Sequence, residues 1–423
     1  MATGGAGYIQ EQVDRQRSAL QKLEADSAVD RKIEIEALKC LIDSSEKIIT
    51  AVAEGKTLVW LTAGISPEIF VTMDIQSLNL LGFARTMTEL RPEGATEFID
   101  RAENLWLPPQ TCSVLKMVIG GILAEQIPTP DLIIAGSHPC DSAIAGFEVI
   151  GELVKVPVFY LDIPSWKDDR TLDYVGSETK RMISFLEEHT GRKLDIGRLR
   201  DVAEESNKAE ELYLEVKEIR KAVPCPQSGA FLRMAFAIRQ RLAGLPMATA
   251  FFRELLADAS EKVRSKKGAV PEERIRVIWA DYDMPFGDWY NWLEREWGAV
   301  VPMSFSAYRP VAYIDTSSYD SMARGLGQNI LHTGMTRLNR GPVEYYIDEF
   351  IRMYKDYKGD CAIFGGHVGN KTFWAAVRIL KDVCREMGIP ALVIEADQYD
   401  PRVVSTEAIR SKIDDFFTMM VLR

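Results

Sequence analysis

Short, mostly apolar segments alternate with helical patterns through most of this chain, and this alternation restricts the fold more than any other feature. Three such segments lie in the first half, at 57–62, 131–135 and 156–161, and four in the second half, at 275–280, 299–305, 362–364 and 391–395. Strands of this kind are buried on both faces, as in parallel sheets that helices cover on each side. We therefore predict an α/β fold with two doubly wound parallel-sheet domains.

The predicted elements divide the chain into four sections. Residues 1–55 form an N-terminal helical segment, 56–168 a first α/β domain, 169–270 a charged helical connecting section, and 271–423 a second α/β domain. The total of 423 residues fits two or three domains. Two domains of this kind leave a cleft between the carboxyl edges of their sheets, where ligands usually bind.

Charge and hydropathy exclude several classes of protein. The 62 acidic residues outnumber the 51 basic ones, and the net charge of −11 argues against wholesale binding to nucleic acid or anionic membranes. The N-terminal residues lack the apolar stretch of a secretory signal, and no apolar run approaches the ~20 residues that span a bilayer. The six cysteines form no CxxC pair and are too sparse for a disulfide scaffold. We expect a cytoplasmic protein with reduced thiols and no nucleic-acid or membrane partner.

Reactive side chains follow the predicted strands. Glu68 follows the first strand, and His138 and Cys140 follow the second; His367 follows a strand of the second half, and Cys112 precedes an apolar helix. Because the carboxyl ends of parallel strands meet at one edge of a sheet, these side chains are candidates for a shared cleft. His367 and His138, with Glu68, are candidates for acid–base work. Glu68 has a plainer interpretation as a carboxylate that compensates the dipole at a helix N-terminus.

The cysteines fall into two groups by position. Cys112 and Cys140 stand at helix starts, where free N–H groups favour a thiolate, although each alone could be a small buried apolar residue. The other four lie mid-helix, between prolines, or at the strand end remote from the cleft, and we interpret them as structural: Cys40, Cys225, Cys361 and Cys384.

The loop after the strand at 362–364 is close to a phosphate-binding loop. The pattern G-x-x-x-x-G-K-[ST] is matched at Gly365 and Lys371, but Asn370 replaces the second glycine. Three interpretations stay open: a nucleotide triphosphatase, a tight turn without ligand, or a milder anion site. In the last, the N–H groups of Gly366, Gly369 and Asn370, with the Lys371 charge, would hold an anionic part of a substrate or cofactor.

A series of short motifs then runs in order from about residue 57 to the C-terminus. Its members are Pro67-Glu68, Cys112-Ser113, Cys140-Asp141, Gly366-His-Val-Gly-Asn-Lys371, and Glu395 with Asp397, Asp400-Pro-Arg402 and Arg410. The series resembles the family of 2-hydroxyacyl-CoA dehydratases and ATP-dependent benzoyl-CoA reductases. The form Gly-His-Val-Gly-x-Lys is closer to the benzoyl-CoA reductase subunits.

This resemblance implies a cofactor and partners. Members are paired homologous α/β subunits, each holding a [4Fe–4S] cluster through three cysteines from separate loops. An iron–sulfur ATPase supplies low-potential electrons, and an acyl-CoA thioester is reduced to a ketyl-type radical under anaerobic conditions. The cluster ligands map onto Cys112 and Cys140, whereas Asn370 stands at the position of the third cysteine.

That departure leaves three alternatives for the metal: a cluster held by two cysteines with Asn370, His367 or an exogenous ligand, a different metal centre, or a subunit that has lost its cluster. The function we expect is that of a subunit of an iron–sulfur acyl-CoA reductase, with His367, Glu68 and His138 handling protons. A 2-hydroxyacyl-CoA dehydratase subunit and a non-catalytic partner subunit are the alternatives.

Overall fold

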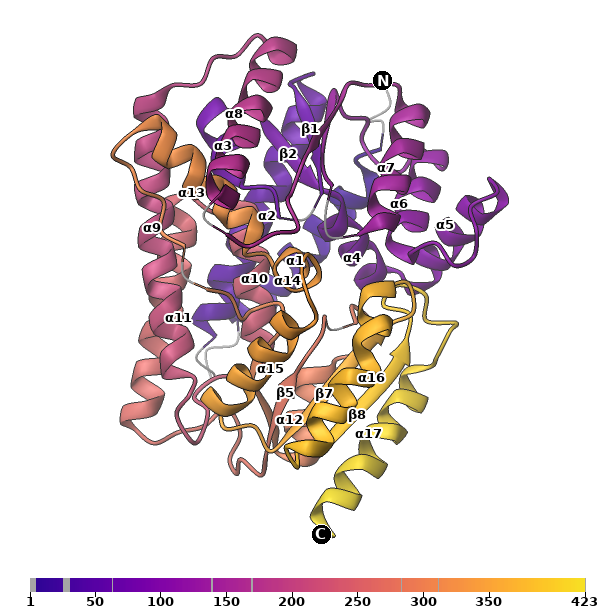
Figure 1. Cartoon of the computed structure of the whole chain (residues 1–423), viewed down its shortest axis with the longest axis vertical. Coiled ribbons are helices and arrows are strands. Elements are labelled where there is room, and N and C mark those ends of the chain that lie inside the picture. Colours follow the sequence, from indigo (N-terminus) through magenta and orange to yellow (C-terminus); the bar gives the residue numbers. More distant parts are fainter. Residues whose placement is uncertain are drawn as a thin grey trace.

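The computed structural model describes residues 5–25, 31–62, 64–137, 140–168, 170–282, 284–310 and 312–422. It confirms the predicted fold class: N-terminal helices precede two four-stranded parallel sheets, and a helical section separates the sheets (Figure 1). The first half lies above the second in the view of Figure 1, with its sheet largely in indigo and magenta.

The first sheet has the strand order β2-β1-β3-β4, and its strands are β1 (Leu58–Leu61), β2 (Gln76–Asn79), β3 (Leu132–Gly136) and β4 (Val158–Leu161). Trp60 pairs with Leu78 on one side and with Ile133 on the other. The sequence prediction found three of these strands and missed β2. This edge strand is mostly polar, and only Leu78 in it is buried, so it lacks the apolar run that marks its neighbours.

The second sheet repeats this arrangement with the order β6-β5-β7-β8, and its strands are β5 (Ile275–Trp279), β6 (Ala299–Ser304), β7 (Cys361–His367) and β8 (Ala391–Ala396). All four were predicted. The central strands β5 and β7 and the edge strand β6 are buried along their whole length, as expected for parallel strands between two helical layers.

Helices cover both sheets and connect them. The N-terminal segment forms α1 (Gly7–Ala25) and α2 (Lys32–Ala53). The first half contains α3 (Pro67–Met73), α4 (Leu80–Leu90), α5 (Pro92–Asn104), α6 (Ser113–Leu123) and α7 (Asp141–Val154). The connecting section contains α8 (Arg170–Thr190), α9 (Ile196–Ile219), α10 (Ala230–Leu242) and α11 (Pro246–Arg264). The second half contains α12 (Trp289–Trp297), α13 (Tyr319–Leu331), α14 (Gly334–Asn339), α15 (Glu344–Asp356), α16 (Lys371–Glu386) and α17 (Thr406–Val421).

One helix of the second half packs on the first half. In Figure 1 the orange α13 lies beside α8, and both contribute to the core on one face of the first sheet. Glycines allow the two helices to approach closely: a Cβ at Gly327 would stand 2.9 Å from the carbonyl oxygen of Val175. The predicted domain boundaries stay a proposal. The helix α13 of the second predicted domain packs on the connecting section and joins the core of the first sheet.

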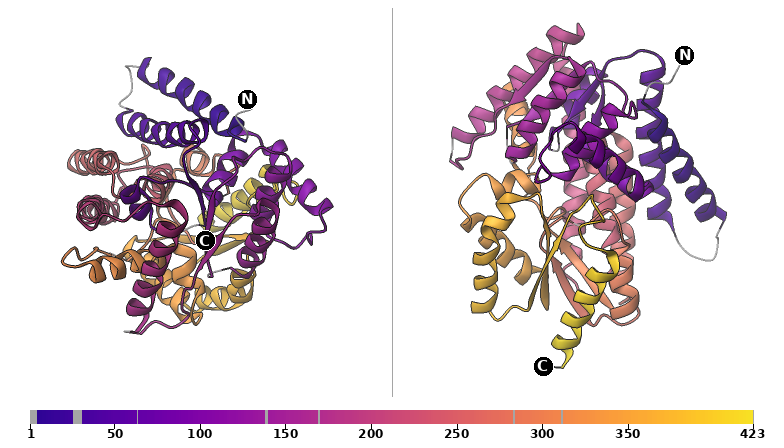
Figure 2. Two further views of the ribbon diagram at one scale, coloured as in Figure 1. Left: turned by 90° about the horizontal axis from the view of Figure 1, so that it is seen from above. Right: turned by 90° about the vertical axis from the view of Figure 1, so that its right-hand side faces the viewer.

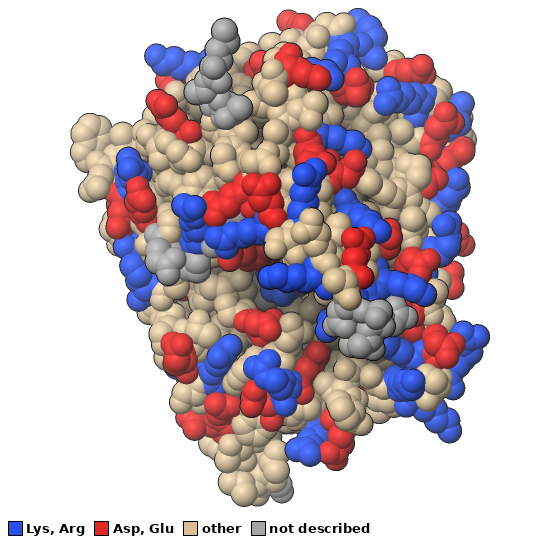
Figure 3. Space-filling view, turned by 180° about the vertical axis from the view of Figure 1, so that it is seen from behind, with Lys and Arg blue, Asp and Glu red and all other residues tan. Residues whose placement is uncertain are grey.

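The N-terminal and connecting helices pack together along one flank. Figure 2 shows α1 and α2 side by side, and α2 joins α9, α10 and α11 in a separate apolar core. On the face shown in Figure 3, Lys and Arg side chains lie interspersed with Asp and Glu. Among the described residues, no helix combines the length and the apolar character needed to cross a membrane.

The contact between α5 and α6 supplies a test of the packing that positions α6. A Cβ at Gly120 would lie 1.9 Å from the carbonyl oxygen of Phe98, a distance that only backbone movement can relieve. We expect Gly120→Ala to lower the free energy of unfolding by more than about 2 kcal/mol, measured by denaturant titration. Gly7→Ala is the control, because a Cβ there meets no heavy atom within 4 Å. Equal stability of the two variants would contradict this account of the α5–α6 contact.

Candidate functional site

A cavity of about 140 Å³ lies between the two halves, where the ends of β5, β7 and β8 face the starts of α6 and α7. Most of its wall is apolar, and the apolar side chains are Leu80, Leu81, Val114, Leu115, Val118, Ala143, Phe147, Ile150 and Met335. Its polar wall brings together predicted site residues from both halves, namely Cys112, Cys140, His367, Gly369 and Asn370. The structure therefore places five of the nine predicted site residues around one cavity.

Cys112 precedes α6, and its thiol touches the ring of His367. The distance from Sγ to Nε2 of His367 is 3.3 Å. Burial raises the pKa of the Cys112 thiol to about 12, and Cys140 nearby adds to the rise, whereas N–H groups of the first turn of α6 lower it. In the metal-free chain, burial therefore outweighs the helix N-terminus, which alone would favour a thiolate. A bound metal ion would displace this proton.

The hydrogen bonds of His367 fix which ring nitrogen carries the proton. Nδ1 accepts from the backbone N–H of Gln398 at 3.2 Å, so in the neutral ring the proton resides on Nε2, which faces Cys112. Burial lowers the pKa of His367, and Asp397, whose Oδ1 lies 3.7 Å from Nδ1, opposes that shift. His367 is thus a neutral donor toward the Cys112 sulfur.

The glycine-rich loop is shorter than the phosphate-loop pattern suggested. Gly366 lies inside β7, opposite Glu395 of β8, and α16 begins at Lys371, so only three residues connect strand and helix. The Asn370 side chain caps α16, because its Oδ1 accepts the N–H of Phe373 at 3.1 Å.

Packing rather than phosphate binding explains these glycines. A Cβ at Gly366 would stand 2.7 Å from the rings of Phe373 and Trp374, and one at Gly369 would stand 2.9 Å from Cα of Cys112. Lys371 is exposed at the first turn of α16. The loop is therefore too short to wrap a triphosphate, and its glycines bring α16 and α6 close together.

These positions allow the predicted cluster to be compared with its site. Two cysteines and one histidine line the cavity, whereas Oδ1 of Asn370 is engaged as a helix cap. In the described part of the chain, no three His, Cys, Asp or Glu side chains converge with metal-site geometry. His138 lies outside the described residues. The described residues therefore offer two cysteines at this cavity and do not supply a three-cysteine ligand set.

A buried carboxylate ties the two halves together beside this cavity. Oδ1 of Asp397, which follows β8, accepts from Oγ of Ser113 at 2.5 Å and from the N–H groups of Tyr399 and Asp400 at 2.9 and 3.0 Å. Ser113 is the first residue of α6 and is fully buried. This contact holds Cys112 against the strand end that carries His367.

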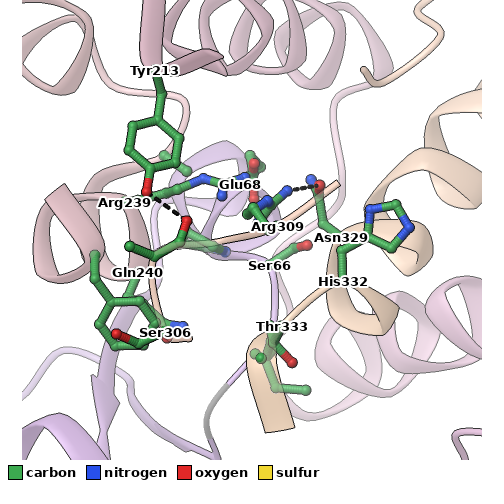
Figure 4. Close-up of a pocket in the computed structure, with 17 residues that line it drawn as sticks. Ser66, Glu68, Tyr213, Arg239, Gln240, Ser306, Arg309, Asn329, His332 and Thr333 are labelled. Carbon is green, nitrogen blue, oxygen red and sulfur yellow. Dashed lines mark hydrogen bonds between the residues drawn. The ribbon is translucent and has the colours of Figure 1, made fainter. Parts of the chain in front are cut away.

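Glu68 lies in a different cavity of about 50 Å³, shown in Figure 4. Its side chain is 2% exposed, and Oε1 accepts from Oγ of Ser206 at 2.7 Å. Arg239, Arg309 and His332 line the same cavity, and Figure 4 shows Arg309 directed toward Asn329, to which Nη2 donates at 2.9 Å. The structure therefore separates Glu68 from His367, with which the sequence analysis had grouped it.

Positive charge dominates the electrostatics of this second cavity. Glu210 lies 2.7 Å from Nη2 of Arg239 and 3.7 Å from Nε of Arg309, so two guanidinium groups share one buried carboxylate. Burial, with Arg239 nearby, lowers the pKa of Arg309 to about 9. Burial and then Arg309 lower the pKa of His332 to about 3, so this histidine is neutral at neutral pH.

The sequence analysis missed four polar residues that line these cavities: Asp281, Arg239, Arg309 and His332. The sequence does carry a signal for Asp281, because this residue comes two positions after the mostly apolar strand β5 and so falls at the carboxyl edge of the sheet. Arg239 lies on α10, Arg309 between β6 and α13, and His332 at the end of α13, and nothing in their local sequence indicates that they converge.

Known proteins match this chain over most of its length. The sequence profile of the family described as 2-hydroxyglutaryl-CoA dehydratase, D-component, matches residues 62–420. One of the benzoyl-CoA reductase subunits of Thauera aromatica is 23% identical, covering 89% of this chain and 90% of that protein. The (R)-phenyllactyl-CoA dehydratase alpha subunit of Clostridium sporogenes is 22% identical, covering 89% and 92%. The lactoyl-CoA dehydratase alpha subunit of Anaerotignum propionicum is 20% identical, covering 88% and 92%.

Removing the hydroxyl that bridges the halves tests the Ser113–Asp397 contact. Because the hydrogen bond is buried and its acceptor is a carboxylate, we expect Ser113→Ala to lower the free energy of unfolding by about 1.5–3 kcal/mol. The matched control is Ser177→Ala on the surface of α8, which should change it by less than about 0.5 kcal/mol. Denaturant titrations of both variants measure the difference, and an unaffected Ser113→Ala would show that the contact contributes nothing.

His332 predicts a dependence of stability on pH. Its pKa is about 3 in the folded chain and near 6.5 when unfolded, so between these values the unfolded chain binds more protons. Stability should therefore fall as the pH drops below about 6.5, and His332→Gln should remove up to about 1.4 kcal/mol per pH unit of that slope. Thermal melts across this pH range measure it, with the exposed His189→Gln as control. Identical slopes in wild type and His332→Gln would refute the assignment.

Proposed function

This chain belongs to the 2-hydroxyglutaryl-CoA dehydratase D-component family, and we propose that it is a subunit of an acyl-CoA reductase complex of the benzoyl-CoA reductase type. In this proposal the cavity between the halves takes the acyl group of a CoA thioester. The observation that carries it is the composition of that cavity: a mostly apolar wall with two cysteines and a histidine at one end. Such a wall suits a benzoyl or aliphatic group better than a second carboxylate.

Cys112 and Cys140 would hold the iron–sulfur cluster that the family resemblance implies, with the remaining position filled by His367 or by an exogenous ligand. When bound, the cluster would supply low-potential single electrons to the thioester-conjugated group. If an exogenous ligand fills that position, the Nε2–H of His367 would donate to the Cys112 sulfur and stabilise its negative charge. Asn370 is the weaker candidate, because leaving its place as helix cap would cost about 1 kcal/mol.

His367 is the residue of this chain that we propose for handling protons near the acyl group. Glu68 faces the second cavity, and any role of Glu68 or His138 in proton transfer stays a proposal. The partners we propose are a homologous α/β subunit and an iron–sulfur ATPase that donates electrons.

Iron and sulfide analysis of the anaerobically purified complex tests the cluster assignment. We expect Cys112→Ser and Cys140→Ser each to remove most of the iron that this chain contributes, because each deletes one of only two protein thiolates. Cys384→Ala in α16 is the matched control, since this cysteine is buried in the core away from the cavity. Unchanged iron and activity in both serine variants would support a subunit without a cluster instead.

The chain is 22–23% identical to both a reductase and a dehydratase subunit, so identity does not distinguish the two functions. Substrate assays can distinguish them. With the reduced ATPase partner present, the complex should reduce benzoyl-CoA. Loss of water from a 2-hydroxyacyl-CoA, without reduction of benzoyl-CoA, would assign the chain to a dehydratase.

A further inference from the structure

Asp281 is a buried carboxyl group in the wall of the cavity between the halves. It follows β5 at the carboxyl edge of the second sheet and is 4% exposed. Oδ1 accepts the N–H of Tyr282 at 2.7 Å, whereas Oδ2 has no hydrogen-bond partner among the described residues. One oxygen is therefore anchored to the backbone, and the other is available to a ligand.

No cation pairs with Asp281 in the described part of the chain. The titratable and charged groups that line the cavity or pack behind Asp281 are Arg85, Cys112, Cys140, Tyr282, His367, Tyr399 and Tyr346, with the Arg337–Glu349 pair beyond. Arg85 is paired with Glu89 at 3.0 Å, and Tyr346 donates its hydroxyl to the carbonyl of Ala280. The carboxyl group thus has no counter-charge to stabilise its ionised form.

A buried carboxylate without a partner is costly, so the proton stays on the oxygen. Burial raises the pKa of Asp281 to about 8, against the opposing effect of the Tyr282 N–H. At neutral pH the group is a carboxylic acid, and a carboxylic acid can donate a hydrogen bond that a carboxylate cannot.

We propose that Asp281 is a substrate-binding acid of this cavity, which donates a hydrogen bond from its protonated Oδ2 to the carbonyl oxygen of an acyl-CoA thioester. The inference rests on the proposed function, because it needs a thioester in the cavity. No bond is broken: the proton stays on Asp281, and the hydrogen bond stabilises negative charge that develops on the carbonyl oxygen during reduction.

Ligand affinity tests this role in the purified full-length chain. The two probes are benzoyl-CoA and its thioether analogue, in which a methylene group replaces the carbonyl, and calorimetry gives their dissociation constants. We expect Asp281→Leu, which has no donor, to weaken benzoyl-CoA binding about tenfold at neutral pH and to leave the thioether unaffected. Asp281→Asn keeps a neutral donor and should bind near the wild-type level.

The pH dependence of benzoyl-CoA affinity supplies a second test. Wild-type affinity for benzoyl-CoA should fall as the pH rises through about 8, because ionisation turns the donor into a repelling carboxylate. That fall should vanish in Asp281→Asn and persist in the control Glu294→Gln, which alters a half-buried carboxyl of raised pKa on α12. Infrared spectra of the wild-type chain at neutral pH should show a protonated-carboxyl band that Asp281→Asn lacks.

Each outcome has a distinct meaning. Equal losses of thioester and thioether binding in Asp281→Leu, or no loss of either, overturn the hydrogen bond and leave the proposed function standing. A missing protonated-carboxyl band in the wild type also overturns it. If the wild-type chain binds neither compound, the proposed acyl-CoA site fails, and the inference that rests on it fails too.

Discussion

The arrangement of this molecule depends on one buried carboxylate. Oδ1 of Asp397 accepts hydrogen bonds from the Ser113 hydroxyl, at the start of α6, and from two N–H groups of its own loop. A single oxygen therefore joins the helix of one half to the strand end of the other. A buried charge is stable only when its acceptor positions are filled, and the hydroxyl from across the interface is one of the three donors. The carboxylate therefore fixes the position of α6 relative to the end of β8.

A series of hydrogen bonds connects the loop of Asp397 with the residues of the site. The Gln398 backbone N–H binds Nδ1 of His367, and the Gln398 side chain binds the carbonyl of Tyr282, next to Asp281. His367 in turn faces the Cys112 thiol. These contacts connect the ends of four secondary-structure elements. Because the polar atoms are buried, they cannot exchange these contacts for hydrogen bonds to water. Preorganisation of this kind keeps the donors in place before any ligand arrives.

Much of this arrangement could be read from the sequence, and the reasons for the failures are physical. Seven of the eight strands are mostly apolar and were predicted, whereas the polar edge strand β2 carries no such signal. Cys140 and His367 were predicted at the cavity because parallel topology brings strand ends together, whereas Asp281 after β5 was missed. Glu68 was grouped with them for the same reason, yet α3 directs it to the other side, toward Ser206. Arg239, Arg309 and His332 converge only through tertiary packing, which no local pattern reports.

The crossing of α13 has a consequence for how a ligand gains entry. Because α13 comes from the second half and packs on α8 of the connecting section and on the core of the first sheet, moving the halves apart as rigid bodies would break a glycine-lined helix contact and part of that core. Such a hinge is expensive, since dense apolar packing would be exposed to water. Access to the cavity is therefore a matter of local side-chain and loop displacement at its rim. We therefore expect the two halves to stay packed together while a ligand enters.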